Sequence, residues 1–293
     1  MNRLQRAEHR LGWLLCAPAA AAMLLVTAYP ILYALWLSLF RYDLRFPEHR
    51  KFVGFSNYTE VLTSEVWWQA MTNTLVITAI SVAFELILGL ALALLMHKAA
   101  WGRRTVRTAV LIPYAIITVV AALAWKFAFD PITGFVNALL DLEISWFTQR
   151  GPALFVIIFT EIWKTAPFMA LLLLAGLTLI PDDLIKAARV DGANAWQRFS
   201  KVTLPLMMPT IGVALLFRTL DALRIFDSVY VQTRGAQDTE TVSIVAYNTL
   251  IVRLNLGLGA AVAVLIFCTM MAIALLFLKS FGPAFARSPG GRP

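Results

Sequence analysis

Charged residues are scarce in this sequence: only 14% of its 293 residues are Asp, Glu, Lys or Arg. A soluble globular domain carries about 25%. The shortage is matched by a 60% share of hydrophobic residues and a mean hydropathy of +0.74. Length alone would suggest about two soluble domains, but apolar runs recur along the whole chain. We therefore predict one polytopic membrane domain rather than a soluble protein.

Cysteine and histidine are also rare. Cys16 and Cys268 lie inside apolar stretches, where cysteine usually serves as a small packing residue, so we expect no disulfide. The three histidines, His9, His49 and His97, are scattered, and the acidic residues form no evident catalytic pair. The sequence also lacks the Gly-x-x-x-x-Gly-Lys-Ser/Thr pattern of a phosphate-binding loop. We expect no catalytic residues, no metal site and no cofactor in this chain.

The net charge of +8 does not indicate a nucleic-acid partner. The basic residues cluster in short segments between apolar runs, which is typical of membrane proteins with positively charged cytoplasmic loops. We therefore expect membrane lipid, and no nucleic acid, around the chain.

Six apolar stretches can each cross a bilayer core, which is about 30 Å thick and needs about 20 helical residues. We predict an all-α protein with transmembrane helices at Leu11–Phe40, Thr74–Met96, Thr108–Phe129, Ala153–Leu177, Leu204–Leu223 and Leu256–Leu278. The first stretch follows basic residues, as in a signal peptide. It is much longer than a signal h-region of about 7–15 residues, so we predict a retained span.

The distribution of basic residues predicts the orientation. With the N-terminus inside, 14 basic residues fall in cytoplasmic segments and seven in outer segments. This excess places both termini in the cytoplasm. We predict a cytoplasmic N-terminus over residues 1–10, a transmembrane domain over 11–281 and a cytoplasmic tail over 282–293.

A polar segment, Pro181–Thr210, separates two of the apolar runs. Its charges exclude it from hydrocarbon, and its alanines and Gly192 leave the backbone open to close approach. Proline and two aspartates suit a helix start, so a short helix is predicted from Pro181 to about Val190. Asp191-Gly192 predicts a turn, with a second helical piece reaching Val202. An ordinary helical loop is the simplest interpretation.

The spacing inside this segment resembles the cytoplasmic signature of the ATP-binding-cassette importer permeases. That signature is Glu-Ala-Ala, three residues, Gly, nine residues, an aliphatic residue, one residue and Leu-Pro. The chain has Lys186-Ala187-Ala188, Gly192 and Val202-Thr203-Leu204-Pro205 at those spacings, with Lys186 where the family usually has Glu. Sugar-type permeases of the maltose-transporter group, and the first permease subunits of actinobacterial trehalose importers, are also similar at residues 159–168, 216–230 and 255–259.

The resemblance implies a permease subunit of an ATP-driven importer in a bacterial inner membrane, for a disaccharide such as trehalose or a maltose-like sugar. It implies as partners a second similar permease, an ATPase dimer that holds ATP and magnesium, and an external sugar-binding lipoprotein or periplasmic protein. By position, a coupling helix over 184–195, in the loop 181–204, would contact the ATPase. Its contact residues would be Leu184, Ala187, Ala188, Asp191, Gly192 and Ala193.

Charged residues inside the predicted spans form a second candidate site. A charge at the bilayer centre costs roughly 2.5–3.5 kcal/mol on insertion scales, so such residues usually pair or serve a function. The set comprises Arg218, Asp221, Arg224 and Asp227 at intervals of three, the i,i+3 pair Glu161 and Lys164, and the isolated Glu85 and Lys126. They could bind sugar hydroxyls or fix helix packing and a gate. We favour the structural or gating role.

Two other classes stay open at this point. An ion-coupled secondary transporter would work without an ATPase, and an integral membrane enzyme would need a converging set of catalytic groups that the sequence does not suggest.

Overall fold

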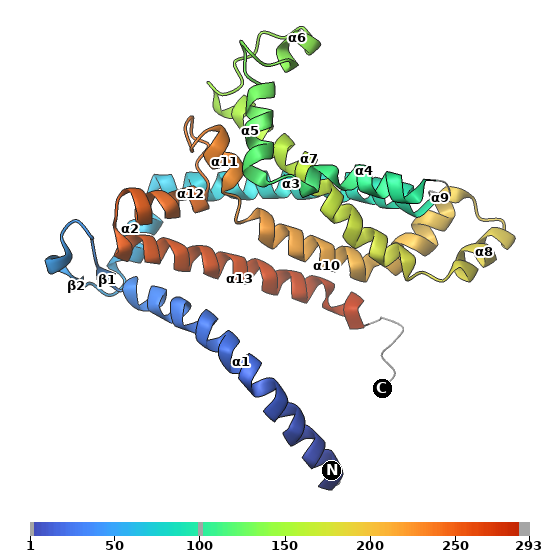
Figure 1. Ribbon diagram of the computed structural model, residues 1–293, viewed down its shortest axis with the longest axis horizontal. Helices are drawn as coiled ribbons and strands as arrows, with labels where there is room; N and C mark the ends of the chain where they lie inside the picture. Colours follow the sequence, from blue (N-terminus) through green and yellow to red (C-terminus); the bar gives the residue numbers. More distant parts are fainter. Residues whose placement is uncertain (1–2, 99–101, 287–293) are drawn as a thin grey trace. The chain divides into compact units, whose positions relative to one another are not determined.

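The computed structural model describes residues 3–98 and 102–286, and within these ranges the chain is helical apart from one two-stranded ribbon (Figure 1). The all-α prediction is confirmed. Residues 1–2, 99–101 and 287–293 lie outside the described part, and with them most of the predicted tail 282–293. Two compact units are present, one of Met1–Ser64 with Ala246–Phe267 and one of Glu65–Val245 with Cys268–Pro293.

The first unit joins a long helix to a small ribbon. Its elements are α1 (Arg3–Leu37), β1 (Phe40–Arg41), η1 (Pro47–His49), β2 (Lys51–Phe52), α2 (Ser56–Thr63), η3 (Asn248–Val252) and the first part of α13 (Leu256–Ala286). The antiparallel strands pair Phe40 with Phe52 and Arg41 with Lys51. The buried amide of Asn57 donates to the carbonyls of Ser38 and Phe40, at 2.7 and 2.9 Å. This amide fixes α2 against the junction of α1 and the ribbon.

The second unit contains the helices around which both candidate sites are built. They are α3 (Glu65–Lys98), α4 (Arg103–Ala115), α5 (Thr118–Ala128), α6 (Val136–Leu140), α7 (Arg150–Thr178), α8 (Asp182–Val190), α9 (Ala195–Arg198), the π-helical η2 (Phe199–Thr203), α10 (Leu204–Ala222), α11 (Asp227–Gln232) and α12 (Val242–Tyr247). Helix α7 packs along α3, and both contact α10. Helix α11 contacts α5 and α7.

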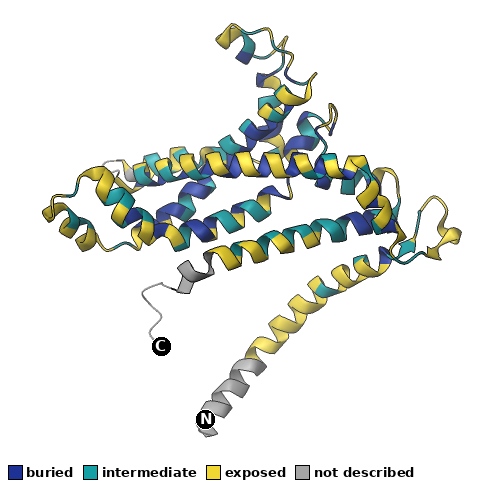
Figure 2. Cartoon of the chain, turned by 180° about the vertical axis from the view of Figure 1, so that it is seen from behind, coloured by how far each residue is buried: buried dark blue, intermediate teal, exposed yellow. Residues whose placement is uncertain are grey.

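Five continuous segments of the described chain are long and apolar enough to span a membrane: Leu15–Leu37, Glu65–Lys98, Arg150–Thr178, Ala195–Gln232 and Leu256–Ser280. They cover five of the six predicted spans. Burial differs strongly among them, since two thirds of the α7 window is buried inside the chain and none of the α1 window is. Figure 2 shows the same contrast, with the coloured part of α1, residues 15–37, mostly exposed. The outer surface of α1 is therefore available to lipid or to another chain.

The predicted third span, Thr108–Phe129, is not one straight helix. It is broken between α4 and α5 with a bend of 86°. Ile116 and Ile117 have extended backbones, with ψ of 136° and 135°. Pro113 removes one helical hydrogen bond just before the break, and β-branched residues favour extended structure. Counted as one span, the bent pair α4 and α5 is the sixth, and these local preferences explain why its helix is broken.

Candidate functional site

The polar segment forms a short helix with a well-defined end. Helix α8 covers Asp182–Val190, as predicted, with two aspartates in its first turn. Gly192 follows with a left-handed φ of +80°. Its N–H donates to Arg189 O at 3.1 Å, and the N–H of Ala193 donates to Ala188 O at 3.0 Å. These two bonds form a Schellman motif, in which glycine is favoured because it lacks a Cβ.

The surface of α8 is open. None of its residues is buried, and Leu184 and Val190 are 45% and 87% exposed. A Cβ added at Gly192 would meet no atom within 4 Å. The six predicted contact residues, which we call the α8 surface, all lie at the exposed or half-exposed part of this loop: Leu184, Ala187, Ala188, Asp191, Gly192 and Ala193.

Lys186, the departure from the family signature, pairs with Asp183 at 3.0 Å, and both side chains are largely exposed. Such a pair contributes little stability. Lys186 therefore places a positive charge on the exposed surface of α8 where the family signature has a negative one.

A hydrogen-bonded turn and two short helical segments join the α8 surface to α10. Asn194 and Gln197 form a capping box at the start of α9, with bonds of 2.8 and 2.9 Å. The guanidinium of Arg198 donates to Ala193 O at 2.6 Å. Helix α9 then continues through η2 directly into α10.

The charges within the spans form a buried cluster around Arg218, which is 1% exposed. Its Nε and Nη2 donate to the Glu85 carboxylate at 2.5 and 2.9 Å. Nη2 also donates to Glu161 at 3.1 Å, and Nη1 donates to Asp221 at 2.8 Å. Bidentate pairing of this kind has both strength and a fixed geometry. The arginine thus joins α10 to α3 and α7.

Two hydroxyls complete this cluster. Thr165 donates to Glu85 at 2.6 Å and Ser228 donates to Glu161 at 2.5 Å. Ser228 belongs to α11, so a fourth helix enters the same network. We call Glu85, Glu161, Thr165, Arg218 and Ser228 the ion cluster. The two hydroxyl partners could not be identified from the sequence, because serine and threonine are common in spans.

The partners of two charged residues differ from those predicted. Glu161 binds Arg218 and Ser228 rather than Lys164, whose ammonium lies 5.4 Å from the Tyr114 ring centre. Glu85, predicted to be isolated, is the bidentate partner of Arg218.

The four charged residues at intervals of three, Arg218, Asp221, Arg224 and Asp227, do not form the predicted ladder along one helix. Helix α10 ends at Ala222, so Arg224 and Asp227 leave its axis, and both are exposed. Within residues 3–98 and 102–286, the only ion pair along the predicted ladder is Arg218–Asp221. Spacing alone predicted the ladder, and the helix end interrupts it.

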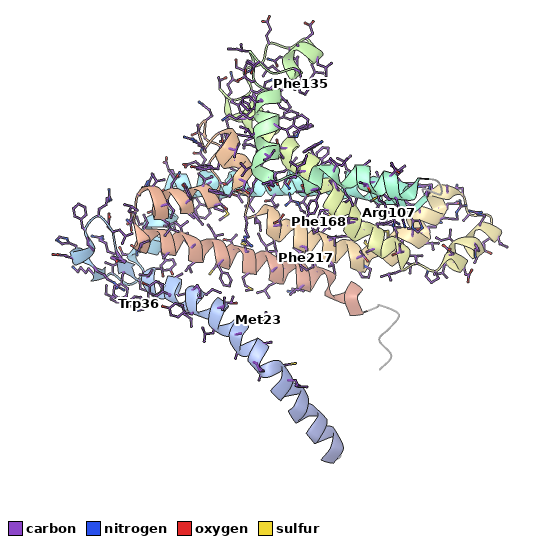
Figure 3. All side chains as sticks on the ribbon, viewed as in Figure 1. Met23, Trp36, Arg107, Phe135, Phe168 and Phe217 are labelled. Carbon is purple, nitrogen blue, oxygen red and sulfur yellow. The ribbon has the colours of Figure 1, made fainter. Side chains whose placement is uncertain are left out.

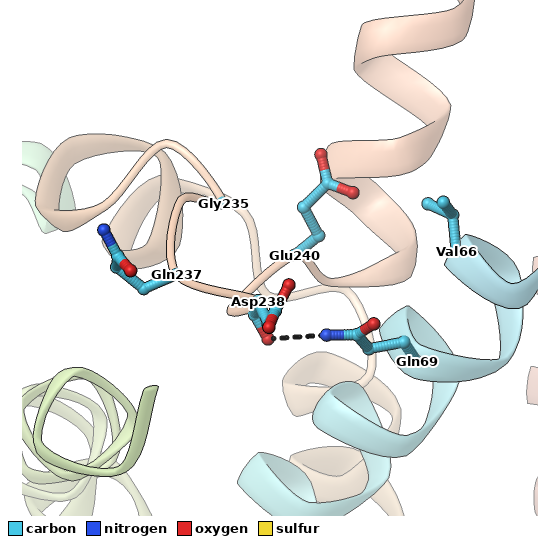
Figure 4. A pocket seen from close by; sticks show the side chains of 6 residues that line it. All are labelled: Val66, Gln69, Gly235, Gln237, Asp238 and Glu240. Carbon is cyan, nitrogen blue, oxygen red and sulfur yellow. Dashed lines mark hydrogen bonds between the residues drawn. The ribbon is translucent and has the colours of Figure 1, made fainter. Parts of the chain in front are cut away.

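A loop after α11 lines a polar hollow of about 210 Å³ in the second unit, with Val66, Gln69, Gly235, Gln237, Asp238 and Glu240 around it (Figure 4). The loop holds Arg234, Gln237 and Asp238 at positive φ. The buried amide of Asn73 donates to the carbonyls of Asp238 and Glu240, both at 2.8 Å. Arg150 donates to the Asn73 carbonyl oxygen at 2.7 Å. One side chain of α3 thus supports a loop with a strained backbone.

Comparison with known proteins assigns a family to this arrangement. The sequence profile of the family described as binding-protein-dependent transport system inner membrane component matches residues 85–287. The trehalose transport system permease protein SugA of Mycobacterium tuberculosis is 54% identical over 287 residues, which cover 98% of this chain and 92% of SugA. The trehalose/maltose transport system permease protein MalF of Thermococcus litoralis is 37% identical, covering 95% of this chain and 96% of MalF.

A solved structure has the same fold. One chain in the crystal structure of a bacterial alginate ABC transporter, in complex with an alginate pentasaccharide-bound periplasmic protein, superposes with a TM-score of 0.81 at 25% identity. The match covers 98% of this chain and 99% of that chain. The similarity therefore extends over both units of the molecule.

Proposed function

The chain belongs to the family of binding-protein-dependent transport system inner membrane components. From this premise we propose that it takes part in the import of a disaccharide. Trehalose is the first candidate and maltose-like sugars are the second. It is a transmembrane permease subunit of an ABC transporter, and ATP hydrolysis belongs to a separate subunit. The cargo assignment is supported by the names of SugA and MalF, which cover nearly the whole chain. The relatives give no support to an ion-coupled mechanism.

The partners follow the family pattern. A second homologous permease would complete the path, an ATPase dimer would hold ATP and magnesium, and an external binding protein would deliver the sugar. The alginate transporter, crystallised with a periplasmic protein, supports the last of these. We place residues 11–281 in a bacterial inner membrane with both termini in the cytoplasm, on the charge bias of 14 to seven.

Coupling to the ATPase is assigned to the 184–195 segment. The observation that carries this proposal is the exposed α8 surface, which continues through α9 and η2 into α10. Small side chains there allow close contact, and the ion cluster ties α10 to α3 and α7. Closure of the ATPase dimer would move α8, and the attached helices would follow.

The charged residues within the spans are assigned to packing and gating. Arg218 and Glu161 are buried and their polar atoms already have protein partners, so they have little capacity left for sugar hydroxyls. Asp221 differs, because its side chain is 71% exposed. Arg224, Asp227 and Lys164 complete the gating set, and Asp221 is its best candidate for sugar contact.

The α8 surface is tested by Gly192→Trp. A tryptophan there would separate α8 from the ATPase, so we expect normal membrane insertion and loss of sugar uptake. Gly102→Trp is the matched control, because Gly102 also has a positive φ, +66°, and no atom within 4 Å of an added Cβ. Normal uptake by Gly192→Trp, or equal loss in both variants, would contradict the assignment.

The energy source and the cargo are tested together in the reconstituted assembly. We expect ATP hydrolysis to be stimulated by the binding protein loaded with trehalose, and uptake to follow ATP. Uptake that an uncoupler abolishes while ATP is held constant would favour ion coupling instead.

A further inference from the structure

Arg50, which lies between η1 and β2 and against the aromatic rings at the end of α1, has no acidic partner among the described residues. The guanidinium of Arg50 lies 4.1 Å from the Trp36 ring centre, 4.6 Å from Phe40 and 5.2 Å from Tyr42. Three rings within about 6 Å hold the cation by its face. In the part of the chain that the structure describes, Arg50 has no ion pair and no side-chain hydrogen bond. Its N–H groups are therefore available to an external anion.

Nearby acids do not neutralise this arginine. Asp43 is bound by Arg45 at 2.6 Å, and hydrogen bonds from Arg45 hold the pKa of the Asp43 carboxyl below its usual value. The segment 40–52 contains four basic residues and two acidic ones. This positive excess is the local exception to the charge bias that predicts the orientation of the chain.

The surroundings of Arg50 are those of a membrane interface. Four aromatic rings contact one another in sequence along α1 and into the ribbon. The ring centroids are 6.0 Å apart for Tyr29 and Tyr33, 5.9 Å for Tyr33 and Trp36, and 4.8 Å for Trp36 and Phe40. Tyr29, Tyr33 and Trp36 are 67%, 45% and 45% exposed. Figure 3 shows Trp36 at the ribbon end of α1, with Met23 lower on the same helix. Tyrosine and tryptophan in such positions anchor spans at the headgroup level.

We propose that Arg50, stacked on Trp36, Phe40 and Tyr42, binds the phosphate of an anionic phospholipid in the outer leaflet. A guanidinium held by its face presents its N–H edge in the geometry that suits bidentate contact with phosphate. The apolar surface of α1, which is exposed within this chain, would lie beside the acyl chains. The assignment to the outer leaflet rests on the proposed orientation, but the binding itself does not depend on transport.

The experiment places a photoreactive probe beside the arginine. Phe52→p-benzoylphenylalanine is suitable, because Phe52 is 63% exposed and its ring lies 5.4 Å from that of Phe40. The assembled transporter is reconstituted in bilayers of equal parts phosphatidylglycerol and phosphatidylcholine, irradiated, and the crosslinked lipid identified by mass spectrometry. We expect phosphatidylglycerol to dominate, and Arg50→Gln to reduce its yield roughly fivefold.

Arg41→Gln is the matched control. It removes the same charge from the same ribbon. Arg41 is paired with Lys51 and Phe40 with Phe52. Because successive strand residues point to opposite faces, Arg41 lies on the face opposite to Phe40 and Phe52. Its crosslinking yield should be unchanged. Arg50→Lys keeps the charge without the planar group and should give an intermediate yield, with gel filtration confirming assembly.

Three outcomes would overturn the proposal. The first is an equal loss in Arg41→Gln and Arg50→Gln, which would indicate surface charge alone. The second is crosslinking to a partner subunit instead of lipid, which would identify a protein contact. The third is equal yields of the two lipids in the unaltered chain. None of these would affect the proposed permease function, which is measured by uptake.

Discussion

Arg218 is 1% exposed and charged, so its environment must compensate for the loss of water. Glu85 and Glu161 provide that compensation from α3 and α7, which lie 133 and 57 residues away in sequence. Removing one partner from a buried pair costs about 3–5 kcal/mol, because the remaining charge stays buried without compensation.

Arg218→Met should therefore lower the stability of the chain by about 3–5 kcal/mol. The carboxylates of Glu85 and Glu161 would both lose their cation. Arg224→Met is the control, since Arg224 is exposed and should change stability by less than about 0.5 kcal/mol. Thermal unfolding of the purified protein in detergent, followed by tryptophan fluorescence, measures the difference. Equal midpoints for the two variants would rule out a stabilising role for the ion cluster.

Sequence spacing identified the charged residues but not their partners. It predicted Glu161 with Lys164 and left Glu85 alone, because i,i+3 neighbours on one helix are the pairs that spacing can reveal. The observed partners come from separate helices. Helix packing determines which faces of α3, α7 and α10 meet. Residue spacing within a single helix does not predict these contacts.

At the scale of elements, prediction succeeded where composition and local chemistry agree. Five apolar runs, the α8 helix and its glycine turn lie where expected. It did not locate the 86° bend within Thr108–Phe129, which local backbone preferences produce inside one apolar run. The conformation of the Arg234–Glu240 loop was also beyond prediction, because it depends on Asn73 from α3.

Asn73→Ala should loosen that loop. The carbonyls of Asp238 and Glu240 would lose their donor and Arg150 its acceptor, at a cost of about 1–3 kcal/mol. Hydrogen exchange of the loop amides should accelerate on the order of tenfold. Gln69→Ala is the control, because its bond to Asp238 is 3.4 Å long. Unchanged exchange in Asn73→Ala would show that the loop supports itself.

For the whole molecule, the charge bias makes a prediction about sidedness. In a background of Cys16→Ser and Cys268→Ser, Glu48→Cys should react with a membrane-impermeant maleimide in intact cells. Asp183→Cys should react only after permeabilisation. Both native side chains are exposed, at η1 and at α8. The reverse pattern would invert the topology and move the α8 surface outside, where no ATPase could reach it.

The ion cluster also has a consequence for biosynthesis. Glu85 leaves the ribosome 133 residues before Arg218, an interval of roughly 7 to 27 seconds at about 5–20 residues per second. During that time Glu85, joined by Glu161 for the last 57 residues, lacks the cation that later neutralises it. Helices α3 and α7 therefore cannot pack through this cluster until α10 is made. Defects in the cluster should thus appear first as failed insertion and rapid degradation of newly made chains.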